Sequence, residues 1–171
     1  VVARRQARSF ASLPELTSMT ASSPVSAGIV ASFQEELEAQ VLLAFFVPAV
    51  VYMADAVGTQ TETVVIRGMA IGVPLRRIVR SELATGLVIG VLLAASFFVF
   101  ALAIWGNASV AATVALALFV SASLATVIAM TLPYLLARLG RDPAFGSGPL
   151  ATVLQDLLSI VVYFAVAAAL V

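Results

Sequence analysis

The feature that most constrains this sequence is a series of long apolar stretches with almost no charged residues. Residues 83–105 and 108–137 carry no charge, residues 148–171 carry one acid, and residues 41–67 carry two acids and a terminal arginine. A helix needs about 20 residues to cross the hydrocarbon core of a bilayer, so all four stretches are long enough. Hydrophobic residues make up 62% of the chain and charged residues 11%, against about 45–50% and about 25% in soluble domains. We expect an all-α integral membrane protein.

The placement of the arginines bears on how often the chain crosses the membrane. A further stretch, residues 9–33, is weakly hydrophobic and contains proline, glutamate and many hydroxyl residues. If it also spans, all nine cationic residues fall on one side, which the positive-inside rule makes the cytoplasm. We therefore expect a multi-pass protein of a plasma or inner membrane, with a cytoplasmic N-terminus, an outer C-terminus and no cytoplasmic regulatory domain in this chain. It forms a single domain of five transmembrane helices at 9–33, 41–67, 83–105, 108–137 and 148–171.

The connection at residues 68–80 mixes apolar side chains with arginines. It contains Leu75, Arg76, Arg77, Ile78, Val79 and Arg80. This pattern is typical of a short helix lying on the membrane surface. Gly86 and Gly90 follow in a GxxxG pattern, which allows close approach of a second helix.

The absence of cysteine and histidine from the sequence limits its chemistry. It excludes disulfides, thiolate or imidazole metal sites and serine–histidine catalysis. Any metal bound by side chains must be held mainly by oxygen, which favours Mg²⁺, Mn²⁺ or Ca²⁺. We expect membrane lipid and divalent cations as partners, and no nucleic acid.

Three acids lie well inside the expected spans: Asp55, Glu62 and Asp156. A charge near a helix centre costs about 2.5–3.5 kcal/mol on insertion scales, so such residues usually face the bundle interior and mark a pathway. The structural alternative is an ion pair that locks two helices together. Arg67 is the only arginine near enough to serve, and it could pair with Glu62. Asp156 has no arginine at its depth, which favours a pathway role.

Polar residues also form one stripe on each of two expected helices. Helical spacing aligns Asp55, Thr59, Glu62 and Thr63. The second stripe contains Gly148, Thr152, Gln155, Asp156, Ser159 and Tyr163. At about 1.5 Å per residue, Thr59 and Asp156 share one level, with Glu62 nearer the cytoplasm and Asp55 nearer the outside. Hydrogen bonding between helices is the alternative explanation for such stripes.

Two motifs resemble the membrane domain of the MgtE-type magnesium transporters. The run DAVGTQTETVVIRGMAIG from residue 55 is similar to the family's Gly-Asn-Gln signature and the Val-Ile-Arg-Gly-like run that follows it. Residues 43–48 (LAFFVP) resemble the start of the same helix. The run LGRDPAFGSGPLATVL from residue 139, followed by Gln155 and Asp156, resembles the Asp-Pro-Ala…Gly-Pro…Asp signature. The resemblance covers residues 31–171.

The resemblance implies a homodimeric magnesium channel of five helices, with the ion path between the second and fifth helices of both subunits. The family's key aspartate aligns with Asp156, which would hold hydrated Mg²⁺, and its pore positions map to Thr59, Thr63, Gly148 and Thr152. Three positions depart from the pattern, with Thr59 for asparagine, Glu62 for a small residue and Asp55 for glycine. Two sets of residues are therefore predicted. The metal ligands are Asp156, Thr152, Glu62 and Asp55, and the pore-lining residues are Thr59, Gln60, Thr63, Gly148, Gln155 and Ser159.

Two other functions are compatible with buried acids. An assembly subunit would use them to bind arginines of a partner protein. An intramembrane aspartyl enzyme would share a proton between two carboxylates, but Asp55 lacks the Gly-x-Gly-Asp context of such enzymes.

Overall fold

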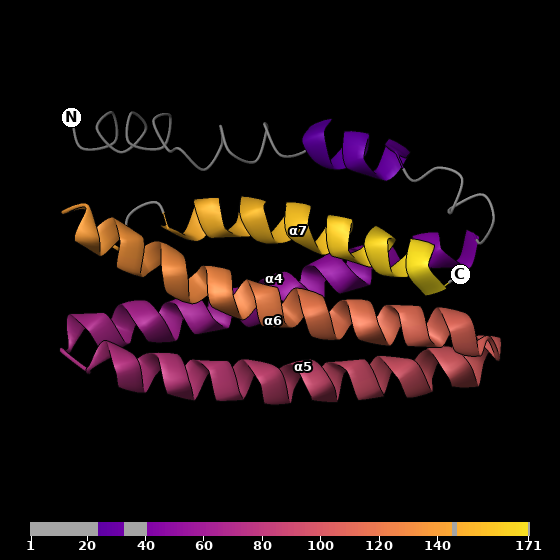
Figure 1. Cartoon of the computed structure of the whole chain (residues 1–171), viewed down its shortest axis with the longest axis horizontal. Coiled ribbons are helices and arrows are strands. Elements are labelled where there is room, and N and C mark those ends of the chain that lie inside the picture. Colours follow the sequence, from indigo (N-terminus) through magenta and orange to yellow (C-terminus); the bar gives the residue numbers. More distant parts are fainter. Residues whose placement is uncertain (1–23, 33–40, 145–146, 171) are drawn as a thin grey trace, which may run out of the picture.

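The computed structural model describes residues 24–32, 41–144 and 147–170, and these residues form a helical bundle (Figure 1). The four long helices are α4 (Val41–Ala70), α5 (Leu75–Trp105), α6 (Ala108–Arg138) and α7 (Ser147–Leu170). Each is long and apolar enough to cross a membrane. The predicted all-α membrane fold is confirmed to this extent, since the described residues of each of the four apolar stretches lie within one long helix.

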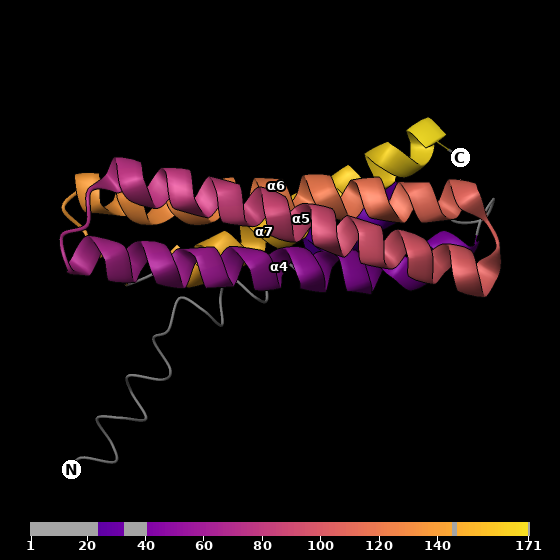
Figure 2. The same cartoon turned by 90° about the horizontal axis from the view of Figure 1, so that it is seen from below.

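Helix α6 occupies the middle of the bundle. It packs against α4, α5 and α7, while α4 packs closely against α7 and less extensively against α5 (Figures 1 and 2). The α4–α5 turn and the α6–α7 connection lie at the same end of the bundle (Figure 1). Helices α4 and α7 are therefore antiparallel neighbours, although they are far apart in the sequence.

The main apolar core lies toward the other end, where the C-terminus of α7 is found. Its largest fully buried side chains include Tyr163, Phe164, Leu43 and Leu118. Helix α5, by contrast, keeps most of its large apolar side chains exposed, including Leu87, Val91 and Phe100. Exposed apolar surface on this scale is expected where lipid is the solvent.

The predicted surface helix in residues 68–80 is wrong. Helix α4 continues to Ala70, and α5 already begins at Leu75. Gly72, with a φ of 76°, ends α4 in a left-handed conformation that favours glycine. The amide of Val73 donates to the Gly68 carbonyl (2.9 Å) and that of Gly72 to the Met69 carbonyl (3.1 Å), a Schellman motif. The arginines assigned to a surface helix therefore belong to the first turns of α5.

The GxxxG pattern does bring two helices together, as predicted. A Cβ atom added at Gly86 would overlap the Thr126 side chain of α6, and one at Gly90 would lie 3.3 Å from the Phe119 ring. Both glycines thus face α6 at close range.

The arginines of the described helices gather at one end of the bundle. Those in the described part of the chain are Arg67, Arg76, Arg77, Arg80, Arg138 and Arg141, and all lie near the α4–α5 turn or the α6–α7 connection (Figure 1). A helix of 30 residues, such as α4, is about 45 Å long and exceeds the hydrocarbon core by several turns. Arginines near its end can therefore reach the interface.

The predicted first span falls largely outside the described residues. Residues 24–32 form a helix, and Ile29 and Val30 pack against the main core. Nine helical residues are too few to cross a bilayer, which takes about 20. Whether residues 9–33 span therefore stays a prediction.

Candidate functional site

The antiparallel seam between α4 and α7 brings the two predicted polar stripes together. At the end where the main core lies, the Tyr163 hydroxyl donates to the Leu43 carbonyl at 2.8 Å. Tyr163 is fully buried. This part of the second stripe therefore joins two helices, the structural alternative for a polar stripe in a membrane.

In the middle of the seam, Gly58 of α4 lies directly against the Gln155 side chain of α7. A Cβ atom at residue 58 would overlap the amide group of Gln155. Gln155 is 2% exposed, and within the described residues neither atom of its amide has a hydrogen-bond partner. Leaving a buried polar group unpaired costs about 1–3 kcal/mol. The buried Gln155 amide therefore lowers the stability of the fold, and stability alone does not account for its place in the seam.

At the arginine-rich end, Glu62 of α4 meets the start of α7. The Ser147 hydroxyl contacts the Glu62 carboxylate as a hydrogen-bond donor and lies 2.6 Å from the Pro143 carbonyl. One hydroxyl proton serves one acceptor at a time. Glu62 is 7% exposed and lies beside Gly148, where an added Cβ would be 3.8 Å from its Oε1.

The ion pair suggested as the alternative for Glu62 does not form. The only side chain found to bond its carboxylate, within the described part of the chain, is Ser147. Arg67 is exposed. The buried acid at this end of the seam is therefore a hydrogen-bonded carboxylate without a cationic partner among these residues.

Asp55 of α4 and Asp156 of α7 each lie within three residues of the Gly58–Gln155 contact. Their carboxylates are close enough for the two charges to repel, and both side chains are half-buried. One carboxylate oxygen of Asp55 is fully buried without a hydrogen-bond partner among the described residues. Two carboxylates that repel each other, one with an unpaired oxygen, form a site where a cation would be stabilised.

The remaining predicted residues divide by exposure. Thr59, Gln60 and Thr63 are exposed on α4, and the Thr63 hydroxyl donates to the Thr59 carbonyl at 2.9 Å. On α7, Thr152 and Gly148 are partly exposed, whereas Ser159 is buried. The exposed threonines and half-buried acids thus share an outer polar face, while Gln155 and Ser159 lie inside the bundle.

The predicted levels agree with the observed contacts. Thr59 and Asp156 were expected at one depth, and their preceding neighbours Gly58 and Gln155 touch. No cluster of three or more acids that could hold a metal ion occurs within residues 24–32, 41–144 and 147–170. Among the described residues of a single copy of the chain, the two acids near each other are Asp55 and Asp156.

Two residues of interest were missed at the sequence level. Ser147, the donor to Glu62, was given no role, although a serine two residues before Pro149 at the start of a helix is a typical capping signal. Glu82 was left out of the acids inside the spans because α5 was expected to begin at residue 83. It lies in the first turns of α5 and is 8% exposed, so it is a further buried acid, just before the apolar stretch predicted to begin at residue 83.

Comparison with known proteins gives one family and several relatives. The model of the MgtE family, described as a divalent cation transporter, matches residues 47–166. A protein named magnesium transporter MgtE from Bacillus subtilis (strain 168) is 34% identical over 151 residues, covering 86% of this chain and 34% of the relative. Its namesake from Thermus thermophilus is 33% identical over 148 residues, covering 84% and 32%. The namesake from Enterococcus faecalis is 27% identical over 160 residues, covering 91% and 35%. The chain spans about a third of the length of these curated relatives.

Proposed function

The chain belongs to the MgtE family of divalent cation transporters and is a multi-pass membrane protein, and on this premise we propose that it carries Mg²⁺ across the membrane along the polar face of α4 and α7. Transport rather than catalysis is the activity of the family, so the intramembrane aspartyl enzyme receives no support. The relatives named above are magnesium transporters, which favours Mg²⁺ over Mn²⁺ and Ca²⁺ as the cargo.

The observation that carries the proposal is the pair of acids Asp55 and Asp156. Two half-buried carboxylates that repel each other lie between helices whose other surfaces are largely apolar. Hydrated Mg²⁺ is typically held by one or two carboxylates while it keeps several of its waters. Exposed hydroxyl groups of Thr59 and Thr63 would offer hydrogen bonds to those waters.

The same face is the reason to propose a homodimer. A face that combines exposed threonines with half-buried acids is poorly suited to contact with lipid tails. A second copy related by a two-fold axis would cover it with an identical stripe. Asp156 of each subunit would then approach the axis, so that one hydrated ion is shared by carboxylates of both chains. In the proposed orientation, the arginine-rich end lies in the cytoplasm and Glu62 lies at the inner mouth.

Asp156→Asn tests this function. Purified chain reconstituted into liposomes with an enclosed Mg²⁺ indicator should take up Mg²⁺. Changes one shell beyond a metal's ligands already cost about 10–100-fold in affinity, so loss of the carboxylate itself should lower the initial flux at least about 10-fold. The dimer should remain, as measured by cross-linking in the liposomes.

Asp142→Asn is the matched control. Asp142 is exposed in the α6–α7 connection and accepts a hydrogen bond from the Ala144 amide, which an asparagine oxygen can also accept. Its flux should equal that of the unmodified chain. Normal flux in Asp156→Asn would refute the site, and loss of the dimer in that variant would favour the assembly-subunit alternative.

A further inference from the structure

Two adjoining hollows lie where α4 turns into α5. The first has a volume of about 360 Å³, and its wall includes the apolar side chains of Val64, Ile71, Val73 and Ile78. The second, of about 600 Å³, is lined by Pro74, Arg76, Arg77, Arg80 and Ser81. Arg77 and Ser81 line both hollows. An apolar cavity and a cationic hollow therefore adjoin and share part of their wall.

The cationic hollow has no internal counter-charge. Arg76, Arg77 and Arg80 are exposed, and none of these three guanidinium groups forms an ion pair with the part of the chain that the structure describes. Planar guanidinium groups bind phosphate through paired N–H donors. The hollow is therefore complementary to an anion that carries several oxygen acceptors.

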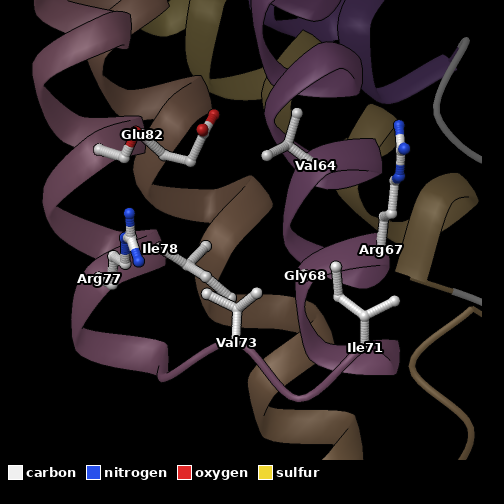
Figure 3. A pocket seen from close by; sticks show the side chains of 9 residues that line it. Val64, Arg67, Gly68, Ile71, Val73, Arg77, Ile78 and Glu82 are labelled. Atoms are coloured by element: carbon white, nitrogen blue, oxygen red, sulfur yellow. The ribbon is translucent and has the colours of Figure 1, made fainter.

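The apolar cavity has a different character (Figure 3). Val73 and Ile78 lie at its centre, with Arg77 on the α5 side and Arg67 on the α4 side. Glu82 stands further along α5 and is 8% exposed. This carboxylate would repel a phosphate placed in the cavity, so an anionic group is directed to the arginine hollow and an apolar group to the side chains of Val64 and Ile71.

We propose that the two hollows together bind one anionic phospholipid, with its phosphate against Arg76, Arg77 and Arg80 and an acyl chain along Val64 and Ile71. A free phosphate ion would satisfy the polar half alone, and an apolar molecule would leave the arginines unused. The site lies at the arginine-rich end of helices that cross the membrane, where anionic headgroups of the cytoplasmic leaflet are within reach. It is separate from the α4–α7 face and does not depend on the proposed transport activity.

Native mass spectrometry of the whole chain, titrated with phosphatidylglycerol, phosphatidylethanolamine and phosphatidylcholine of identical acyl chains, tests the proposal. Phosphatidylglycerol should bind at least about 10-fold more tightly than phosphatidylcholine. Its water-soluble headgroup, glycerophosphoglycerol, should not displace it at equal concentration. Equal binding of the three lipids, or displacement by the headgroup alone, would overturn the proposal, the second outcome in favour of a soluble phosphate ester as ligand.

A pair of double variants locates the site. Arg77→Gln with Arg80→Gln should weaken phosphatidylglycerol binding by about 10-fold or more, because each arginine near the surface contributes to the attraction of anionic lipid. Arg138→Gln with Arg141→Gln removes the same charge from the same end of the bundle (Figure 1), and neither residue lines the hollows. That control should change binding less than about 2-fold, since neither residue lines the hollows and the attraction between exposed charges that are not in contact is weakened by salt. Equal losses in both variants would refute a specific site, and unchanged binding in both would do so as well.

Discussion

The α5–α6 seam and the α4–α7 seam each bring two helices together through a glycine, but the facing side chains differ. In the α5–α6 seam, Gly86 lies against Thr126, whose hydroxyl donates to the Ala122 carbonyl of its own helix at 3.0 Å. In the α4–α7 seam, Gly58 lies against Gln155, whose amide finds no partner within the described residues. A short hydroxyl can satisfy itself within its own helix, whereas the buried amide remains unpaired.

The α5–α6 seam is therefore a packing contact, whereas the α4–α7 seam buries polar groups at a cost in stability. The α4–α7 seam also contains the Glu62 carboxylate, buried and hydrogen-bonded by Ser147, and the acids Asp55 and Asp156. Each of these arrangements lowers stability in a membrane relative to an apolar contact. We infer that the α5–α6 seam serves packing alone, and that the part of the α4–α7 seam from Asp55 to Glu62 is arranged for the ion.

The sharpest test of this contrast is the same substitution in both seams. Gly86→Ala should destabilise the fold by up to about 3 kcal/mol, because the added methyl overlaps the branched Thr126 side chain close to its backbone. Gly58→Ala should cost less, because it meets only the amide end of a flexible side chain. Thermal unfolding in detergent measures both effects.

Transport should respond in the opposite order. Mg²⁺ flux per folded molecule should be unchanged in Gly86→Ala and altered in Gly58→Ala, which displaces Gln155 next to Asp156. Liposome flux, normalised to the fraction of folded protein, gives the comparison. Altered flux in Gly86→Ala, or unaltered flux in Gly58→Ala, would remove the functional distinction between the two seams.

The next effect in size concerns the buried acid. Ser147→Ala should lower the stability by about 1–2 kcal/mol, because it removes the donor to the buried Glu62 carboxylate. Glu62→Gln should be milder, since a glutamine oxygen still accepts the bond from Ser147, yet it removes a charge from the proposed inner mouth. We expect it to change the preference among Mg²⁺, Mn²⁺ and Ca²⁺ in the flux assay. An unchanged preference would give Glu62 a purely structural role.

Much of the fold follows from the sequence for a simple physical reason. A span must be about 20 residues long and nearly free of charge, and residues 83–105 and 108–137 meet both conditions without ambiguity. The end of α4 was harder to predict. Arginines at residues 76, 77 and 80 suggested a surface segment, but α5 extends through them because a helix that exceeds the hydrocarbon core can place its first turns at the interface.

The candidate site was predictable in outline and less so in its contacts. Helical spacing brought Asp55 and Asp156 to facing stripes because it depends only on residues of the same helix and on the depth of each helix. Which groups touch depends on how α4 and α7 rotate about their axes. That rotation is set by packing, such as Gly58 against Gln155, and no local pattern encodes it. The pairing of Glu62 with Ser147 rather than Arg67 belongs to this second class.

The smallest expected effect lies at the far end of the α4–α7 seam. Tyr163→Phe removes the hydroxyl that donates to the Leu43 carbonyl at 2.8 Å and leaves the buried ring in place. The stability should fall by about 0.5–1.5 kcal/mol, the net value of a typical hydrogen bond. Flux per folded molecule should remain unchanged, because this contact lies beyond the acids, among apolar side chains of the main core. Tyr134→Phe is a suitable control, since it removes the same hydroxyl from a tyrosine that is half-buried and lies at the arginine-rich end, with the Arg138 guanidinium 4.8 Å above its ring. A marked loss of flux in Tyr163→Phe at normal stability would extend the functional part of the seam to its whole length, and would contradict a division of α4–α7 into a packing end and an ion-binding part.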